Sequence, residues 1–181
     1  MDMRRALAVV TLAALAAAPA ALAEPAAGTR SAGDGWIVHV SVEPPGLGPI
    51  VASVGRMRPA AENDAHAWLQ HDLVLENIGE RPVRLADTRK AALLGPPGRP
   101  LLLAAHEGCG YAVQPLAPVC LLYLRLLTVE PRGSVASTIT LFKGLRGMKP
   151  LTPGTYVFRT TIRFQAGREF PFRLVYRLAT F

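Results

Sequence analysis

The stretch Leu151-Thr-Pro-Gly-Thr-Tyr-Val-Phe-Arg-Thr-Thr-Ile-Arg-Phe164 decides the fold class of this chain. A Pro-Gly turn at 153–154 leads into a run whose alternate positions are apolar, namely Tyr156, Phe158, Ile162 and Phe164. Polar side chains stand between them, at Arg159, Thr161 and Arg163. A period of two is typical of a β-strand with one buried face. The stretch therefore predicts a strand that turns aromatic side chains to a core and arginines to solvent.

The same alternation recurs along the chain, in the segments Trp36–Val42, Trp68–Glu76, Gly133–Phe142 and Phe170–Leu178. Gly- and Pro-rich turns separate these segments at roughly ten-residue spacing, and no long segment has a helical period. This pattern predicts an all-β antiparallel sandwich of about eight to ten strands. Trp68–Glu76 and Pro82–Leu85, joined by a Gly-containing turn, are predicted to pair with each other.

Gly154 and Tyr156 stand where a tyrosine corner begins. In such a corner the tyrosine hydroxyl bonds to a main-chain group a few residues upstream and fixes the crossover between the sheets. The sequence predicts this hydrogen bond for Tyr156.

Taken together, LVLENIGERPVRL, the GPPG hairpin, STITL and LTPGTYVF resemble bacterial exported domains of the immunoglobulin type. More loosely, the x-N-x-G strand end and the P-G-x-Y turn are similar to the BsuPI-type proteinase-inhibitor domains. The resemblance covers about residues 70–178 and implies an immunoglobulin-like sandwich. Phe158 stands where antibody-type domains place their second core cysteine, and no inhibitory loop carries over residue by residue.

The N-terminal segment has the composition of a secretory signal peptide. Arg4 and Arg5 precede an Ala-rich apolar centre, and Ala21-Leu-Ala23 forms a small-x-small cleavage site. We expect residues 1–23 to be a cleaved signal, residues 24–35 a flexible lead-in, and residues 36–181 a single domain. This organisation predicts a periplasmic or secreted protein.

The two cysteines, Cys109 and Cys120, are expected to form one disulfide, as an isolated pair does in an oxidising compartment. The loop-entropy relation gives such a bond roughly 3 kcal/mol of stabilisation. A redox role is the alternative, but it needs a thiol of low pKa, and only His106 is near enough to lower one.

Metal binding and catalysis have little support in the sequence. His106-Glu-Gly-Cys109 contains ligand types at short spacing, and His66 and His71 lie elsewhere, but zinc sites normally show two tight ligand pairs. His71 shares the apolar face of Leu69 and Leu73, so a buried, hydrogen-bonded histidine is favoured. No nucleophile elbow, zinc-protease helix or phosphate loop is present. We therefore predict no metal, no cofactor and no enzyme, with a hydrolase built from distant residues as a third alternative.

Four arginines form the candidate binding surface. The period of two places Arg159 and Arg163 on the outward side of one strand, and Arg173 and Arg177 on the outward side of the next. A register that pairs Arg163 with Arg173 and Arg159 with Arg177 would bring like charges together, which predicts acidic neighbours on an adjoining strand or an acidic partner. The alternative is a solvated face that guards against edge pairing.

The net charge of +7 favours anionic partners over cationic ones. Scattered arginines without an aromatic-basic motif argue against nucleic acid, and no segment beyond the N-terminus is apolar enough to span a membrane. The sequence thus predicts a non-catalytic binding or assembly module of the cell envelope, whose partner is an envelope protein or an anionic surface. A proteinase-inhibitor-like domain, using the loop 109–120, is the second alternative.

Overall fold

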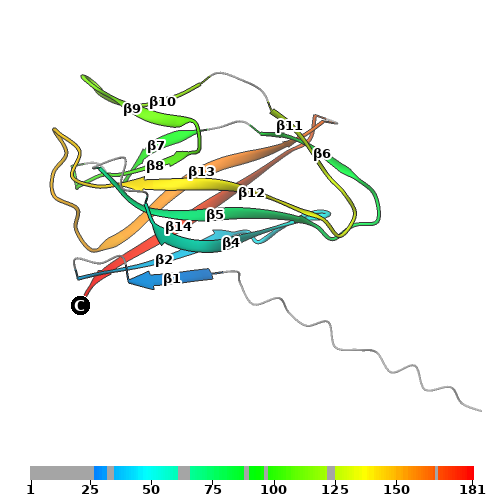
Figure 1. Cartoon of the computed structure of the whole chain (residues 1–181), viewed down its shortest axis with the longest axis horizontal. Helices are drawn as coiled ribbons and strands as arrows, with labels where there is room; N and C mark the ends of the chain where they lie inside the picture. The colour runs from blue at the N-terminus through cyan, green and yellow to red at the C-terminus, as the bar shows by residue number, and fades with distance from the viewer. Residues whose placement is uncertain are drawn as a thin grey trace, which may run out of the picture.

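The computed structural model describes residues 27–31, 35–60, 66–87, 90–95, 98–121, 125–165 and 167–181. These residues form two six-stranded antiparallel sheets and one two-stranded hairpin (Figure 1). The all-β sandwich prediction is confirmed. The predicted signal peptide lies outside the described residues.

Sheet A contains both ends of the described chain. In spatial order its strands are β1 (Ala27–Ser31), β2 (Trp36–Glu43), β14 (Glu169–Thr180), β13 (Gly154–Phe164), β6 (Val83–Asp87) and β11 (Arg125–Val129). The long pair β13–β14 stands at its centre, so the stretch that decides the fold class also organises this sheet.

Sheet B is built from the middle of the chain. Its strands, in spatial order, are β3 (Gly46–Leu47), β4 (Ile50–Pro59), β5 (Ala67–Asn77), β12 (Ser134–Phe142), β8 (Leu102–His106) and β7 (Ala91–Leu94). A separate hairpin of β9 (Cys109–Val113) and β10 (Leu116–Cys120) follows β8.

Two sequence expectations differ from the structure. Residues 27–31 of the predicted lead-in form β1, which pairs with β2 from Ala27 opposite Ser41 to Ser31 opposite Ile37. The side chains of this edge strand are small or polar, and it is held by its main-chain pairing with β2. Gly28 packs so closely on Met57 that an added Cβ would lie 2.7 Å from the Met57 sulfur. The described residues also form fourteen strands, more than the predicted eight to ten.

The predicted pairing of Trp68–Glu76 with Pro82–Leu85 is wrong, because β5 and β6 belong to different sheets. The buried Asn77 holds the crossover. Its Nδ2 donates to the carbonyl oxygens of Arg81 at 2.8 Å and Val129 at 2.9 Å, and its Oδ1 accepts from the Gly79 amide at 3.0 Å. These bonds turn the chain from sheet B into sheet A.

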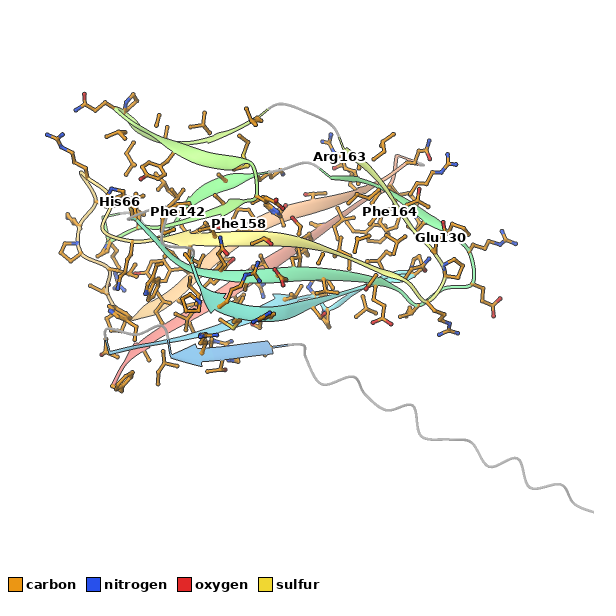
Figure 2. The ribbon with its side chains drawn as sticks, in the orientation of Figure 1. His66, Glu130, Phe142, Phe158, Arg163 and Phe164 are labelled. Atoms are coloured by element: carbon orange, nitrogen blue, oxygen red, sulfur yellow. A yellow bond between two sulfur atoms is a disulfide. The ribbon has the colours of Figure 1, made fainter. Side chains whose placement is uncertain are left out.

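The main core fills the space between the sheets. The even positions of β13 and β14 point into it as predicted, and Phe158, Leu174 and Tyr176 are completely buried. Phe158 is labelled between the two sheets in Figure 2. Each such aromatic or aliphatic side chain contributes about 1.5–3 kcal/mol through removal of apolar surface from water.

A second, smaller core lies outside sheet B, beneath the β9–β10 hairpin. Leu103, Ala105, Phe142 and Leu145 are its buried members. Tyr111 and Leu116 of the hairpin pack on them, and the Tyr111 ring meets the Phe142 ring edge-on with centroids 5.5 Å apart. The hairpin therefore forms a local third layer over β7 and β8.

Candidate functional site

The outer face of sheet A carries all four predicted arginines. Arg159 and Arg163 on β13, and Arg173 and Arg177 on β14, are exposed. Figure 2 labels Arg163 at the end of the sandwich where β6 and β11 lie. The alternation of residues correctly predicts that the four side chains point outward, but it does not determine which residues stand opposite one another on β13 and β14.

The predicted arginine register is wrong by four residues. Arg159 stands opposite Arg173, Arg163 opposite Glu169, and Arg177 opposite Thr155. The turn between the strands sets this register, since the Phe164 amide donates to the Arg168 carbonyl at 2.9 Å and the Gly167 amide donates to the Phe164 carbonyl at 2.9 Å. Gly167 has φ of 78°, a conformation that glycine adopts without strain, so the turn closes earlier than the predicted register requires.

Acidic neighbours neutralise two of the four arginines. Arg163 Nε lies 2.6 Å from Glu169 Oε1 within the hairpin. Arg173 bonds to Glu43 Oε2 on the adjoining strand β2, from Nη2 at 2.6 Å and from Nε at 2.8 Å. Exposed pairs of this kind contribute only about 0–1 kcal/mol each. They hold the two guanidinium groups in place more than they stabilise the sheet.

Arg159 lines an open depression of about 740 Å³ over β13 and β14. We define the β13–β14 depression by its described lining residues: Glu43, Pro44, Lys90, Arg159, Thr160, Thr161, Pro171, Phe172 and Arg173. Three cations and one carboxylate therefore face the same volume. Arg163 and Arg177 lie outside it. Lys90 was not predicted, because it enters through the connection before β7. An acidic neighbour on an adjoining strand was predicted, but its identity as Glu43 depends on the β2–β14 register.

Tyr156 makes a hydrogen bond of the kind a tyrosine corner requires. Its hydroxyl donates to the Thr152 carbonyl oxygen at 2.9 Å, four residues upstream, and the side chain is buried. Gly154 begins β13 between the two partners. The bond fixes the loop before β13 to the strand itself, and so contributes to the placement of Arg159 three residues later.

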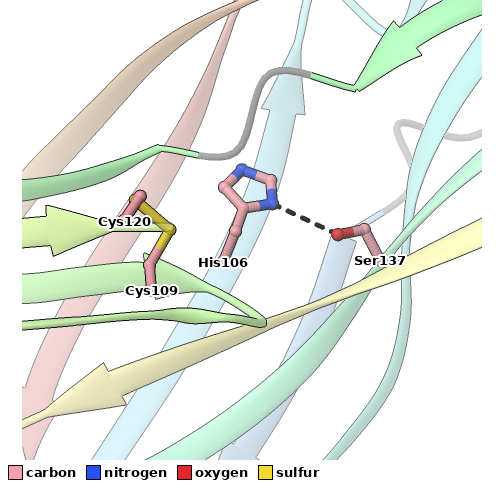
Figure 3. Close-up of a disulfide and its surroundings, with 4 residues drawn as sticks. All are labelled: His106, Cys109, Cys120 and Ser137. Carbon is pink, nitrogen blue, oxygen red and sulfur yellow. Dashed lines mark hydrogen bonds between the residues drawn. A yellow bond between two sulfur atoms is a disulfide. The ribbon is translucent and has the colours of Figure 1, made fainter. Parts of the chain in front are cut away.

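Cys109 and Cys120 form the predicted disulfide, with their sulfur atoms 2.03 Å apart (Figure 3). The two residues face each other across β9 and β10, and their Cα atoms lie 4.0 Å apart. The bond closes the base of the hairpin that covers the second core.

Two histidines are buried between the sheets. His71 Nε2 lies 3.0 Å from the Tyr176 hydroxyl. Burial lowers the pKa of His71 to about 4, and it raises the pKa of Tyr176. This pair joins β5 to β14 across the core and is the buried, hydrogen-bonded arrangement favoured for His71.

His106 meets Ser137 within the fold, with 3.2 Å between Nδ1 and Oγ (Figure 3). Both residues line an apolar cavity of about 50 Å³, together with Leu73, Leu85 and Thr160. Small-molecule sites usually measure about 300–1,000 Å³, so this cavity has room for a few atoms rather than a substrate. Proximity of this serine and histidine was not visible in the sequence, because they lie on different strands.

No group of three or more potential metal ligands occurs among the described residues. Within the same part of the chain, no helix has the length and apolar character to cross a bilayer.

Comparisons of the chain with models of protein families, with curated proteins and with solved structures found no match. The functional argument therefore rests on the geometry of the sites described above.

Proposed function

We propose that this chain is an exported, non-catalytic binding module of the cell envelope that recognises an anionic partner at the β13–β14 depression. One observation carries the proposal: Arg159 and Lys90 line the depression without an acidic partner among the described residues. Unpaired cations beside each other repel, and a ligand that supplies negative charge relieves this repulsion.

The paired arginine adds directional recognition. Glu43 holds Arg173 from one side, and Arg173 stands directly opposite Arg159. A guanidinium fixed in this way loses little side-chain freedom on binding and can present its remaining N–H groups to a carboxylate or phosphate. The depression thus combines one fixed guanidinium with two further cations.

Two features support the exported and immunoglobulin-like parts of the proposal. A disulfide between Cys109 and Cys120 is typical of proteins in oxidising compartments. The Tyr156–Thr152 bond is the kind of contact that fixes immunoglobulin-like sandwiches at their tyrosine corner. The inhibitor and hydrolase alternatives stay predictions.

Binding of the purified protein to polyglutamate and to polyphosphate, measured across a salt series, tests the proposal. We expect affinity for at least one polymer, which falls as salt rises because screening weakens charge attraction. The double variant Arg159→Gln/Lys90→Gln should weaken binding about tenfold or more, since each lost contact with a charged group costs about 1.5–3 kcal/mol before screening.

The matched control is Arg163→Gln/Arg177→Gln. It removes the same net charge, two cations, from the outer face of sheet A but leaves the depression intact. It should weaken binding only slightly. Equal losses in the two double variants would mean that the overall field attracts the polymer without a site, and unchanged binding in both would mean that the arginines only solvate the sheet.

A further inference from the structure

Strand β11 ends sheet A on a side where no described strand pairs with it. It has five residues, and within the described chain its hydrogen-bonded neighbour is β6 (Figure 1). The other sheet edges differ from it: Gly28 of β1 lies against Met57 of β4, β3 has only two residues, and β7 lies beneath the β9–β10 hairpin. An open edge strand is a template for a further strand.

The hydrogen bonds of β6 show which main-chain groups of β11 face outward. The Gln165 amide donates to the Arg84 carbonyl at 3.0 Å, so Arg84 directs its main-chain groups toward β13. Successive residues of a strand direct these groups to alternate sides, and Thr128 stands opposite Arg84. The N–H and C=O groups of Thr128, and those of Leu126 two residues before it, therefore point away from β6. These groups face the side on which no described strand lies.

The apolar cavity of about 50 Å³ lies beneath this edge. Leu127 of β11 lines it from sheet A, and Val135 and Ala136 of β12 line it from sheet B. Ala136 is exposed and the other two are half-buried, so the cavity lies near the surface between β11 and β12. Strand β8 pairs with β12 only from Ile139 to Phe142 and does not extend over this opening. A strand added to β11 would place its inward side chains beside Leu127, at the opening.

The outward side of the edge carries a cation. Arg84 is exposed, its Nη1 donates to Gln165 Oε1 at 3.2 Å, and no ion pair involves it in the part of the chain that the structure describes. A residue opposite Thr128 on an added strand would lie in the same cross-strand row as Arg84. An acidic side chain there would meet opposite charge. A second copy of this chain does not supply it, because the outward residues of its β11 are Leu126 and Thr128 and its net charge is +7.

We propose that β11 accepts an extended acidic peptide of a partner protein as an added antiparallel strand of sheet A. We define the β11 edge as Leu126, Leu127 and Thr128, with Arg84 beside them. The main chain of the peptide bonds to Leu126 and Thr128, its small aliphatic side chains cover the cavity beside Leu127, and its outward acids face Arg84. The antiparallel direction is that of the other pairs in sheet A. The β11 edge is distinct from the β13–β14 depression and does not depend on the function proposed for it.

Fluorescence anisotropy with the labelled peptide Glu-Val-Glu-Val-Glu-Val tests this proposal on the purified protein. In an antiparallel pair, glutamates on the outward face direct their N–H groups toward β11, and the valines direct theirs away. N-methylation of the glutamate amides should therefore weaken binding about tenfold or more. N-methylation of the valine amides should leave binding nearly unchanged. The charge control Lys-Val-Lys-Val-Lys-Val should bind much more weakly than the acidic peptide.

Two variants test the edge from the side of the protein. Thr128→Pro removes an outward N–H and keeps the bonds between β11 and β6, because proline is tolerated where an edge strand faces solvent. It should weaken binding about threefold or more. Arg84→Gln should weaken binding about two- to fivefold. The matched control is Arg177→Gln, which removes an exposed arginine opposite Thr155, at the other end of β13, and should not change binding.

Melting temperatures within a few degrees of wild type show that the variants are folded. If Thr128→Pro is unstable, the two methylated peptides apply the same test to the wild-type protein. Titration of Arg159→Gln/Lys90→Gln separates the two proposed sites, since binding through the β11 edge should persist in that variant.

Four results would overturn the proposal. Wild type could show no saturable binding of the acidic peptide, or the two methylated peptides could bind equally. The Arg159→Gln/Lys90→Gln variant could lose binding while Thr128→Pro and Arg84→Gln keep it, which would assign the peptide to the depression. Alternatively, sedimentation velocity could show a wild-type dimer that Thr128→Pro abolishes without any peptide binding, which would assign the edge to a second copy of this chain.

Discussion

The outer faces of the two sheets come from the same alternation of residues, yet they have different environments. On sheet A, the outward residues of β13 and β14 include four exposed arginines and Glu169, beside the half-buried Val157 and the buried Val175. On sheet B, the outward Leu103, Ala105 and Phe142 are almost fully buried, because the β9–β10 hairpin covers them.

This contrast shows that the period of a strand tells which residues share a face, but not what covers that face. A covered outer face needs apolar residues at consecutive positions, as in Leu101-Leu-Leu-Ala-Ala105. A face that no other layer covers can keep charged side chains at its exposed positions, as the outer face of sheet A does with its arginines. The candidate function thus falls on sheet A, while the outer face of sheet B contributes to stability.

The largest expected effect is a difference in unfolding free energy between a substitution on the covered outer face of sheet B and one on the outer face of sheet A. Phe142→Ala should cost about 3–5 kcal/mol, because it empties space in the second core. Val157→Ala, on the half-buried outer face of sheet A, should cost about 1 kcal/mol or less. Urea unfolding of both variants measures the difference. Similar costs would mean that the hairpin does not cover sheet B in solution.

The pH dependence of the unfolding free energy tests the core between the two sheets, where His71 is buried. In the native protein the pKa of His71 is about 4, so the ring stays neutral until the pH falls to that value. In the unfolded chain the same side chain has its ordinary pKa of 6.5 and takes up a proton at higher pH. Protons therefore favour the unfolded state in this window, and stability should fall by about 3 kcal/mol as the pH drops from 6.5 to 4. Urea unfolding of wild type and His71→Gln at several pH values tests this. The variant should lack most of this slope, and equal slopes would contradict the buried neutral histidine.

Loss of the disulfide should loosen the cover of sheet B. Cys109→Ser/Cys120→Ser is expected to cost about 2–3 kcal/mol, since an unfolded chain without the bond gains loop entropy. Hydrogen exchange should rise on β9, β10 and β8 while β13 and β14 keep their protection. A uniform rise over both sheets would mean that the hairpin is not a separate layer.

The smallest effect concerns the loop before the arginine strand. Tyr156→Phe removes the bond to the Thr152 carbonyl and should cost about 1–1.5 kcal/mol. The midpoint of chemical denaturation reports it. An unchanged midpoint would show that this bond is absent in solution.

The sequence predicted the inward and outward residues of β13 and β14, the disulfide and the fold class, because alternation and cysteine pairing are local signals. It did not predict that Arg159 stands opposite Arg173, because the turn at Gly167 sets the register of β13 against β14. A change in the position of that turn changes the partner of every residue along the two strands. It also missed Lys90, and it predicted an acidic neighbour on an adjoining strand without identifying Glu43, because both residues reach the depression from distant segments. Strand β1 had no side-chain pattern to reveal it, as main-chain bonds to β2 define it.

The most direct test of the proposed anion site is an NMR titration of the 15N-labelled protein with hexaglutamate, repeated with inorganic phosphate. If the β13–β14 depression binds anions, the amide signals of Arg159, Thr160 and Thr161 and of Phe172 and Arg173 should move together and saturate. The same signals should stay still in the Arg159→Gln/Lys90→Gln variant. Shifts confined to other strands, or no saturable shift with either anion, would contradict the account.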